Sequence, residues 1–318
     1  MIPTVGEGEA VIELRRVHRF FGKTRAVDDI SFAVARGSVF GYIGPNGAGK
    51  TTSMRILATL ELPSYGDAIV DGFSVVNDPE MVRKRLGFMP DAFGTYANVN
   101  CAEYLDFFAR SYGLVGRERT QRLKRVLEFT GAAGIAEKPI RGLSKGMKQR
   151  ICLGRALMHD PAVLILDEPA AGLDPRARIE LRKMIGALAA EGKTILISSH
   201  ILTELAEMCD AVGIIEQGRL LATGSVEEIQ RQRQQHRELT LRVMHGAAEA
   251  AERLGQRDDC LEIRVEGDWV RTAFSGDLAA QADVLRDLVE AGLPVAELTA
   301  RTKSLEDVFL QVTEGLVQ

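Results

Sequence analysis

Two hydrophobic patterns alternate along the first two thirds of the chain. Short apolar runs of strand length, the clearest being VFGYIG, AVLILD and TILISS, are each followed by a loop and then by apolar residues at helical spacing. From about Ala10 to Leu221 this alternation predicts an α/β domain with a largely parallel sheet. Ligands of such sheets bind beside the carboxyl ends of the strands. We therefore expect a site in the loops that follow these runs.

The segment 98–160 interrupts the alternation, because strand-like runs disappear from it. It opens with a capping-box pattern, Asn100 with Glu103, and apolar side chains then recur at helical spacing: Tyr104, Leu105, Phe108 and Tyr112. Two more helices are expected over 118–129 and 145–159. The pattern indicates a mostly helical subdomain inserted into the α/β core, with the aromatic stripe packed in its interior.

A polar stretch rich in Gln and Arg over 226–237 is predicted to be a linker that ends a first domain of residues 10–225. Residues 238–318 then predict strand 239–244, a helix, a hairpin that turns at Gly267-Asp268, helix 278–290, strand 295–298 and a helix begun by Ser304. The order βαββαβ indicates a small ferredoxin-like α+β accessory domain. Because no polar cluster in it points to a ligand, we expect a packing or dimer-stabilising role rather than a ligand sensor.

Composition adds three limits. With 318 residues, 46% of them hydrophobic and 26% charged, the chain is typical of a globular protein of two domains. A net charge of -4 offers no general attraction to nucleic acid, so no nucleic-acid partner is expected. No apolar run approaches the roughly 20 residues of a membrane-spanning helix, and no signal-peptide pattern opens the sequence, so a cytoplasmic location is expected.

The strongest chemical signal is the stretch GPNGAGKT, which lies between the apolar run VFGYI and a helical pattern. Two glycines four apart, then Lys and Thr, form a phosphate loop whose amides and helix N-terminus gather around an anion. We expect ATP to bind through Gly44, Pro45, Asn46, Gly47, Ala48, Gly49, Lys50, Thr51 and Thr52. Lys50 can reach the β- and γ-phosphates, and the Thr51 hydroxyl can bind Mg²⁺.

Two adjacent carboxylates end the apolar run AVLILDEP. Neighbouring residues at a strand end point in different directions, so one can serve a metal while the other faces an attacking water. We assign Asp167 to Mg²⁺, directly or through water, and Glu168 to the role of general base.

With these two sites placed, the region from Val11 to Leu221 resembles the ATP-binding cassette family, in the family's order of motifs. LSKGMKQR is similar to the family's signature motif: it keeps Ser144 and Gly146 but carries Lys145 and Met147 where the commonest version has Gly and Gln. The resemblance implies that this helix N-terminus faces the γ-phosphate held by a second cassette, so that activity requires a homodimer or paired cassette.

Further family positions match residue by residue. GLDP resembles the loop along the cassette interface, with Asp174 its main residue, and SSH resembles the switch motif whose histidine is His200. Phe21 resembles the aromatic on which adenine stacks, with Phe20 the competing choice and core packing the alternative to both. Where the family usually places a glutamine that touches Mg²⁺ and water, LGFMPDAFG offers Asp91, a hard-cation ligand. We hypothesise that Asp91 senses the metal and couples nucleotide state to a membrane partner.

The resemblance implies an ATPase that drives export through an integral membrane permease on a separate chain. The cassette would then lie in the cytoplasm, peripheral to the inner face of the cell membrane. The alternative is a soluble cassette ATPase that acts on nucleic acid or ribosomes. Relatives of that kind generally carry tandem cassettes or a long coiled-coil insertion, and neither is visible in this sequence.

Overall fold

The structure is a computed structural model that describes residues 4–5, 9–91, 94, 98–201, 205, 208–225, 228 and 237–301. The chain divides into two compact units, the first within residues 1–226 and the second within 227–311. The helix predicted to begin at Ser304 lies outside the described residues, as does most of the predicted linker.

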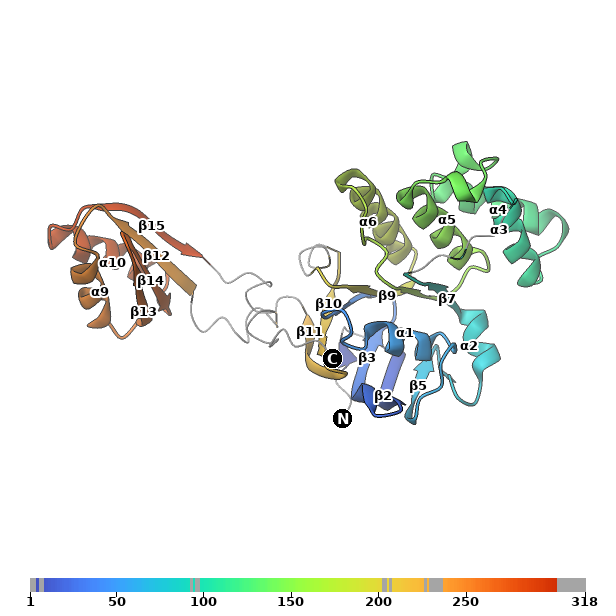
Figure 1. Cartoon of the computed structure of the whole chain (residues 1–318), viewed down its shortest axis with the longest axis horizontal. Helices are drawn as coiled ribbons and strands as arrows, with labels where there is room; N and C mark the ends of the chain where they lie inside the picture. Colours follow the sequence, from blue (N-terminus) through green and yellow to red (C-terminus); the bar gives the residue numbers. More distant parts are fainter. Residues whose placement is uncertain are drawn as a thin grey trace. The chain divides into compact units, whose positions relative to one another are not determined.

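The first unit is built around a six-stranded sheet in the order β11-β10-β4-β9-β8-β7 (Figure 1). Its strands are β4 (Val39–Ile43), β7 (Leu86–Met89), β8 (Val163–Leu166), β9 (Thr194–Ser199), β10 (Ala211–Glu216) and β11 (Arg219–Ser225). All neighbours are parallel except β10 and β11. The four central strands are buried along their whole length, as expected for a parallel sheet covered on both faces. The prediction of a largely parallel core sheet is confirmed.

A five-stranded sheet in the order β1-β3-β2-β5-β6 packs against this core. Its strands are β1 (Thr4–Val5), β2 (Ala10–Phe21), β3 (Thr24–Ala35), β5 (Tyr65–Val70) and β6 (Phe73–Ser74), and all pairs but β1 with β3 are antiparallel. Helices α1 (Lys50–Leu57) and α2 (Pro79–Arg85) contribute buried residues to the same hydrophobic core. Phe32 of β3 stacks on Phe40 of β4 with ring centroids 5.0 Å apart, which ties the two sheets together.

The segment 98–160 is helical, as predicted. It holds α3 (Cys101–Ser111), α4 (Gly116–Phe129), η1 (Ala133–Ile135), η2 (Ile140–Gly142) and α5 (Lys145–Leu157), and α6 (Pro175–Ala190) follows β8. The described residues of this segment contain no strand, only an isolated bridge between Asn100 and Pro139. Both hydrogen bonds of the predicted capping box are present at Asn100 and Glu103. Figure 1 shows α5 and α6 on one side of the core sheet and α1 on the other.

The aromatic stripe of α3 is only partly internal. Tyr104 and Leu105 are buried, but Tyr112 is 42% exposed, so its placement in the interior was wrong. The helix ends at Ser111, and Tyr112 instead stacks on the His159 ring with centroids 3.9 Å apart.

The second unit is a four-stranded antiparallel sheet in the order β13-β14-β12-β15, with two helices. Its elements are β12 (Arg237–Val243), α9 (Ala247–Gly255), β13 (Cys260–Glu266), β14 (Trp269–Phe274), α10 (Leu278–Glu290) and β15 (Val295–Arg301). The hairpin turns at Gly267 and Asp268, and α10 has the predicted bounds. The chain order and the sheet order together confirm the ferredoxin-like topology.

Candidate nucleotide site

The phosphate loop joins β4, at the centre of the core sheet, to α1. Its glycines are required by the backbone: φ is 81° at Gly47 and 103° at Gly49, both in the left-handed region. A Cβ on Gly49 would also lie 2.3 Å from the carbonyl oxygen of Ala26, and one on Gly44 would lie 2.2 Å from that of Ile215. Because no side chain in the described part of the chain caps the N-terminus of α1, its first amides are left for an anion.

Lys50, the first residue of α1, is buried with 5% of its surface exposed. Its Nζ donates to the carbonyl oxygens of Gly44 at 2.6 Å and Pro45 at 3.1 Å. It also lies 3.3 Å from Oε1 of Glu168. Burial lowers the pKa of Lys50, and the negative charge of Glu168 opposes that shift. The ammonium group is therefore held inside the loop by oxygen atoms.

Asp167 follows β8 and is fully buried. Its Oδ1 accepts a hydrogen bond of 2.7 Å from the Ser198 hydroxyl, whereas Oδ2 has no hydrogen-bond partner in the described part of the chain. Burial raises the pKa of this carboxyl, hydrogen bonds from Ser198 and Thr51 oppose the shift, and the charge of nearby Asp91 adds to it. A buried carboxylate oxygen without a partner, beside a hydroxyl and a second carboxylate, fits a hard cation such as Mg²⁺.

The backbone of Glu168 adopts φ 48°, in the left-handed region that non-glycine residues seldom occupy. Its amide donates to the Ser198 hydroxyl at 2.8 Å. Oε2 lies 2.8 Å from Nδ1 of His200, which follows β9, and Oε1 lies beside Lys50. The tertiary structure thus joins Lys50, Glu168 and His200 in one cluster at the carboxyl ends of β4, β8 and β9.

Sequence reasoning missed the role of Ser198 in this cluster. Its hydroxyl donates to Asp167 and accepts from the Glu168 amide, so one side chain fixes both carboxylates. The signal available was a buried serine at the end of β9, just before His200. Adjacent parallel strands place that position beside the end of β8.

The residues of the signature motif and the interface loop lie together around a second cavity. Ser144 is the N-cap of α5 and Asp174 that of α6, with Oδ1 of Asp174 accepting from the Ala177 amide at 2.9 Å. Both line a cavity of about 270 Å³ with Gly146. No residue of the phosphate loop lines this cavity.

Phe21 ends β2 and is 47% exposed, with the Arg19 guanidinium over its ring at 4.5 Å. Phe20 instead packs edge-on against His18 and Tyr65, at centroid distances of 5.8 and 6.1 Å. Of the two rings, Phe21 is therefore the one with a face available to a ligand.

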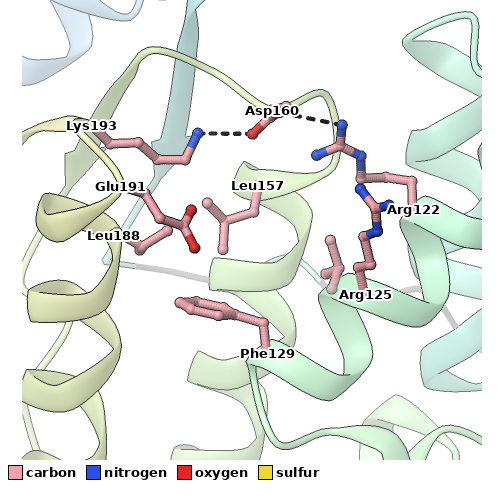
Figure 2. Close-up of a pocket in the computed structure, with 9 residues that line it drawn as sticks. Arg122, Arg125, Phe129, Leu157, Asp160, Leu188, Glu191 and Lys193 are labelled. Carbon is pink, nitrogen blue, oxygen red and sulfur yellow. Dashed lines mark hydrogen bonds and ion pairs between the residues drawn. The ribbon is translucent and has the colours of Figure 1, made fainter.

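A further cavity of about 340 Å³ lies where α4, the end of α5 and the end of α6 meet (Figure 2). Asp160 bridges its rim, with Oδ1 2.8 Å from Nζ of Lys193 and Oδ2 3.3 Å from the Arg122 guanidinium. Leu157 and Phe129 form part of the wall below. The ion pairs therefore tie the helical segment to the core sheet, since Arg122 belongs to α4 and Lys193 precedes β9.

The phosphate loop, the paired carboxylates and the order of the core sheet define a phosphate-loop nucleotide-binding cassette. A profile described as ABC transporter matches residues 27–171. A probable multidrug ABC transporter ATP-binding protein of Escherichia coli is 38% identical over 71% of this chain, and the chain spans 39% of that relative's length. The bacitracin transport ATP-binding protein of Bacillus licheniformis is 33% identical over 96% of this chain and 98% of its own length.

A solved structure described as the ATP-binding subunit of an ABC transporter has 31% sequence identity and a TM-score of 0.64. It covers 70% of this chain, and the match covers 92% of the solved chain. The chain belongs to the ABC transporter family, and the relatives it matches are ATP-binding proteins of that family. The resemblance inferred from its motifs is therefore confirmed. Among the described residues, no helix has the length and apolar character needed to cross a membrane.

Proposed function

We propose that this chain hydrolyses ATP at a site shared by two cassettes and that the resulting motion drives export through a separate membrane subunit. The observation that carries the proposal is the position of the Glu168 carboxylate. It lies between Lys50 and His200, 3.3 and 2.8 Å away, and the preceding residue, Asp167, has a buried oxygen without a hydrogen-bond partner among the described residues. A base, a cation and a hydrogen-bonding ring beside a phosphate loop are the groups that phosphoryl transfer to water requires.

Nucleotide would be held by the phosphate-loop amides and Lys50, with adenine against Phe21. Thr51, Asp167 and Asp91 would hold Mg²⁺, which neutralises charge on the phosphates when bound. Lys50 must exchange its contact with Glu168 for a phosphate oxygen. That exchange would release Glu168 to accept a proton from water, while His200 keeps its carboxylate oriented through the contact at Oε2.

Sharing between two cassettes is supported by the separation of the motifs within one chain. Ser144, Gly146 and Asp174 line a cavity that contains no phosphate-loop residue, so in one copy they cannot serve its own nucleotide through that cavity. The uncapped phosphate-loop helix of one copy and the α5 N-terminus of another would then face one γ-phosphate.

Glu168→Gln tests the proposal. We expect the variant to bind ATP, to dimerise and to turn over at least about 10²-fold more slowly, because a positioned general base contributes 10²–10⁴-fold. Steady-state phosphate release measures the rate. The matched control is Glu191→Gln, an exposed residue at the end of α6, which should leave turnover unchanged. Normal turnover in Glu168→Gln would remove Glu168 from its role.

The metal role of Asp91 has its own test. Asp91→Ala should raise the Mg²⁺ concentration needed for half-maximal ATPase activity, because a hard carboxylate ligand is lost. A Mg²⁺ titration of the purified variant gives that value. An unchanged titration curve together with unchanged transport would contradict both the metal role and the coupling role.

Export is supported by two relatives, a probable multidrug transporter ATP-binding protein and a bacitracin transport ATP-binding protein. We propose that the chain lies at the inner face of the cell membrane, bound to a permease with several spanning segments. Affinity purification from membranes should recover such a protein, and recovery of ribosomes or nucleic acid instead would favour the soluble alternative.

A further inference from the structure

Among the described residues of the C-terminal domain, the two helices cover only one face of its sheet. Leu239, Leu241 and Val243 of β12 point into the core shared with α9 and α10. The alternate residues lie on the opposite, open face, which carries a hollow of about 480 Å³. The hollow is lined by Glu238, Thr240, Trp269, Arg271, Glu297, Thr299 and Arg301.

The two strands at the middle and edge of this face carry short sequences that differ at one position of five. β12 contains ELTLR over 238–242, and β15 contains ELTAR over 297–301. The strands are antiparallel, and their register sets Glu238 opposite Arg301, Thr240 opposite Thr299 and Arg242 opposite Glu297. The result is a charge square, defined here as Glu238, Arg242, Glu297 and Arg301, with opposite charges along every side.

The four charged side chains of this square are available to a binding partner. In the part of the chain that the structure describes, none of the four side chains has an ion pair, and Arg242 only lies over the Trp269 ring at 5.3 Å. Two carboxylates balance two guanidinium groups, so the square itself has no net charge. A polyanion such as nucleic acid or an anionic lipid surface gains little from it.

We propose that this open face docks against the same face of a second copy of the chain. A two-fold interface requires a patch that complements itself. If the axis runs along the strands, Glu238 meets Arg301 of the second copy; if it runs across them, Glu238 meets Arg242 of the second copy. In both cases every glutamate of the square meets an arginine, and threonines meet at the centre.

This inference rests on the proposed pairing of two cassettes, which supplies the second copy at high effective concentration. A polar face without a large apolar centre suits a weak contact between two chains, which is measurable at high protein concentration and is reinforced where the cassettes also pair. The docked faces also bury Trp269, the only tryptophan in the sequence. Its emission therefore reports on this surface.

The experiment uses two full-length variants of opposite charge. Arg242→Glu with Arg301→Glu makes the square wholly acidic, and Glu238→Arg with Glu297→Arg makes it wholly basic. Without nucleotide, we expect each variant alone to self-associate at least about tenfold more weakly than the unmodified chain, since like charges meet across the interface. An equimolar mixture should restore association, because acidic and basic squares then face each other. Sedimentation equilibrium measures the association of each variant, of their mixture and of the unmodified chain.

Two controls separate docking from folding and from catalysis. Arg253→Glu with Arg286→Glu makes the same change of charge on α9 and α10, and should associate like the unmodified chain. In the unmodified chain, Trp269 emission should shift to shorter wavelength as protein concentration rises, and added salt should reverse the shift. Because nucleotide is absent, failure of ATP hydrolysis would not alter these results. The inference would be overturned if either variant alone associated as strongly as the unmodified chain, if the mixture stayed monomeric, or if emission did not depend on concentration.

Discussion

The cassette and the C-terminal domain are both helix-covered sheets, but they place charge differently. The cassette buries Lys50 and Asp167, which are 5% and 0% exposed, at the ends of parallel strands. The C-terminal domain instead has an apolar core and carries its charges on the surface, including the open face of its antiparallel sheet. Buried charges cost stability unless they are paired, so their retention indicates chemistry, whereas exposed charges cost little, and those of the open face are the ones proposed to serve association.

His159, in the cassette, gives the largest expected effect of burial outside the nucleotide site. Its Nε2 lies 3.1 Å from the Leu86 carbonyl oxygen, and Nδ1 has no hydrogen-bond partner among the described residues. Burial lowers the pKa of His159 from 6.5 to about 4. Because the folded pKa is below the unfolded one, this contribution to stability is complete above pH 6.5 and is lost as pH falls through about 4.

His159→Phe should keep the stack on Tyr112 and remove this dependence. We expect the fall in unfolding free energy between pH 6.5 and 4 to shrink by up to about 3 kcal/mol. Urea unfolding at a series of pH values measures it, with exposed His245→Phe in the C-terminal domain as the control. If the unfolding free energy of His159→Phe falls with pH as steeply as that of the unmodified chain, burial of His159 does not cause the pH dependence of the cassette.

Phe21 is half-exposed and should have an intermediate effect. Phe21→Ala should weaken ATP binding by about fivefold, equivalent to about 1 kcal/mol, because an aromatic ring stacked on adenine is lost. Isothermal titration calorimetry gives the dissociation constant. Phe20→Ala is the matched control, since that ring packs on His18 and Tyr65. The assignment would be reversed if only Phe20→Ala weakened binding.

Asp287, in the C-terminal domain, should have the smallest effect. It lies 2.6 Å from the Arg257 guanidinium, but its side chain is 56% exposed. Asp287→Ala should lower the unfolding free energy by at most about 1 kcal/mol, and less at high salt, as for exposed ion pairs in general. Thermal unfolding at low and high salt measures this. A larger loss of unfolding free energy that does not depend on salt would contradict the view that charged pairs in the C-terminal domain contribute little to stability.

Much of the site could be predicted from the sequence, because its parts are contiguous motifs. The phosphate loop, the adjacent carboxylates and the capping box of Asn100 and Glu103 depend on near neighbours, and the capping box forms both expected hydrogen bonds. The role of Ser198 could not be predicted in this way. It depends on β9 pairing with β8, a contact between segments about thirty residues apart.

The amino-acid sequence by itself determined the three clearest core strands, the helices of 98–160 and the hairpin at Gly267, and it predicted the candidate nucleotide residues, since hydrophobic period, caps and glycines act over a few residues. Only the tertiary structure decided that Glu168 lies between Lys50 and His200, that its backbone turns to a positive φ, and that two ELTxR strands pair as a charge square. These features depend on strand order and register, which the packing of distant segments sets.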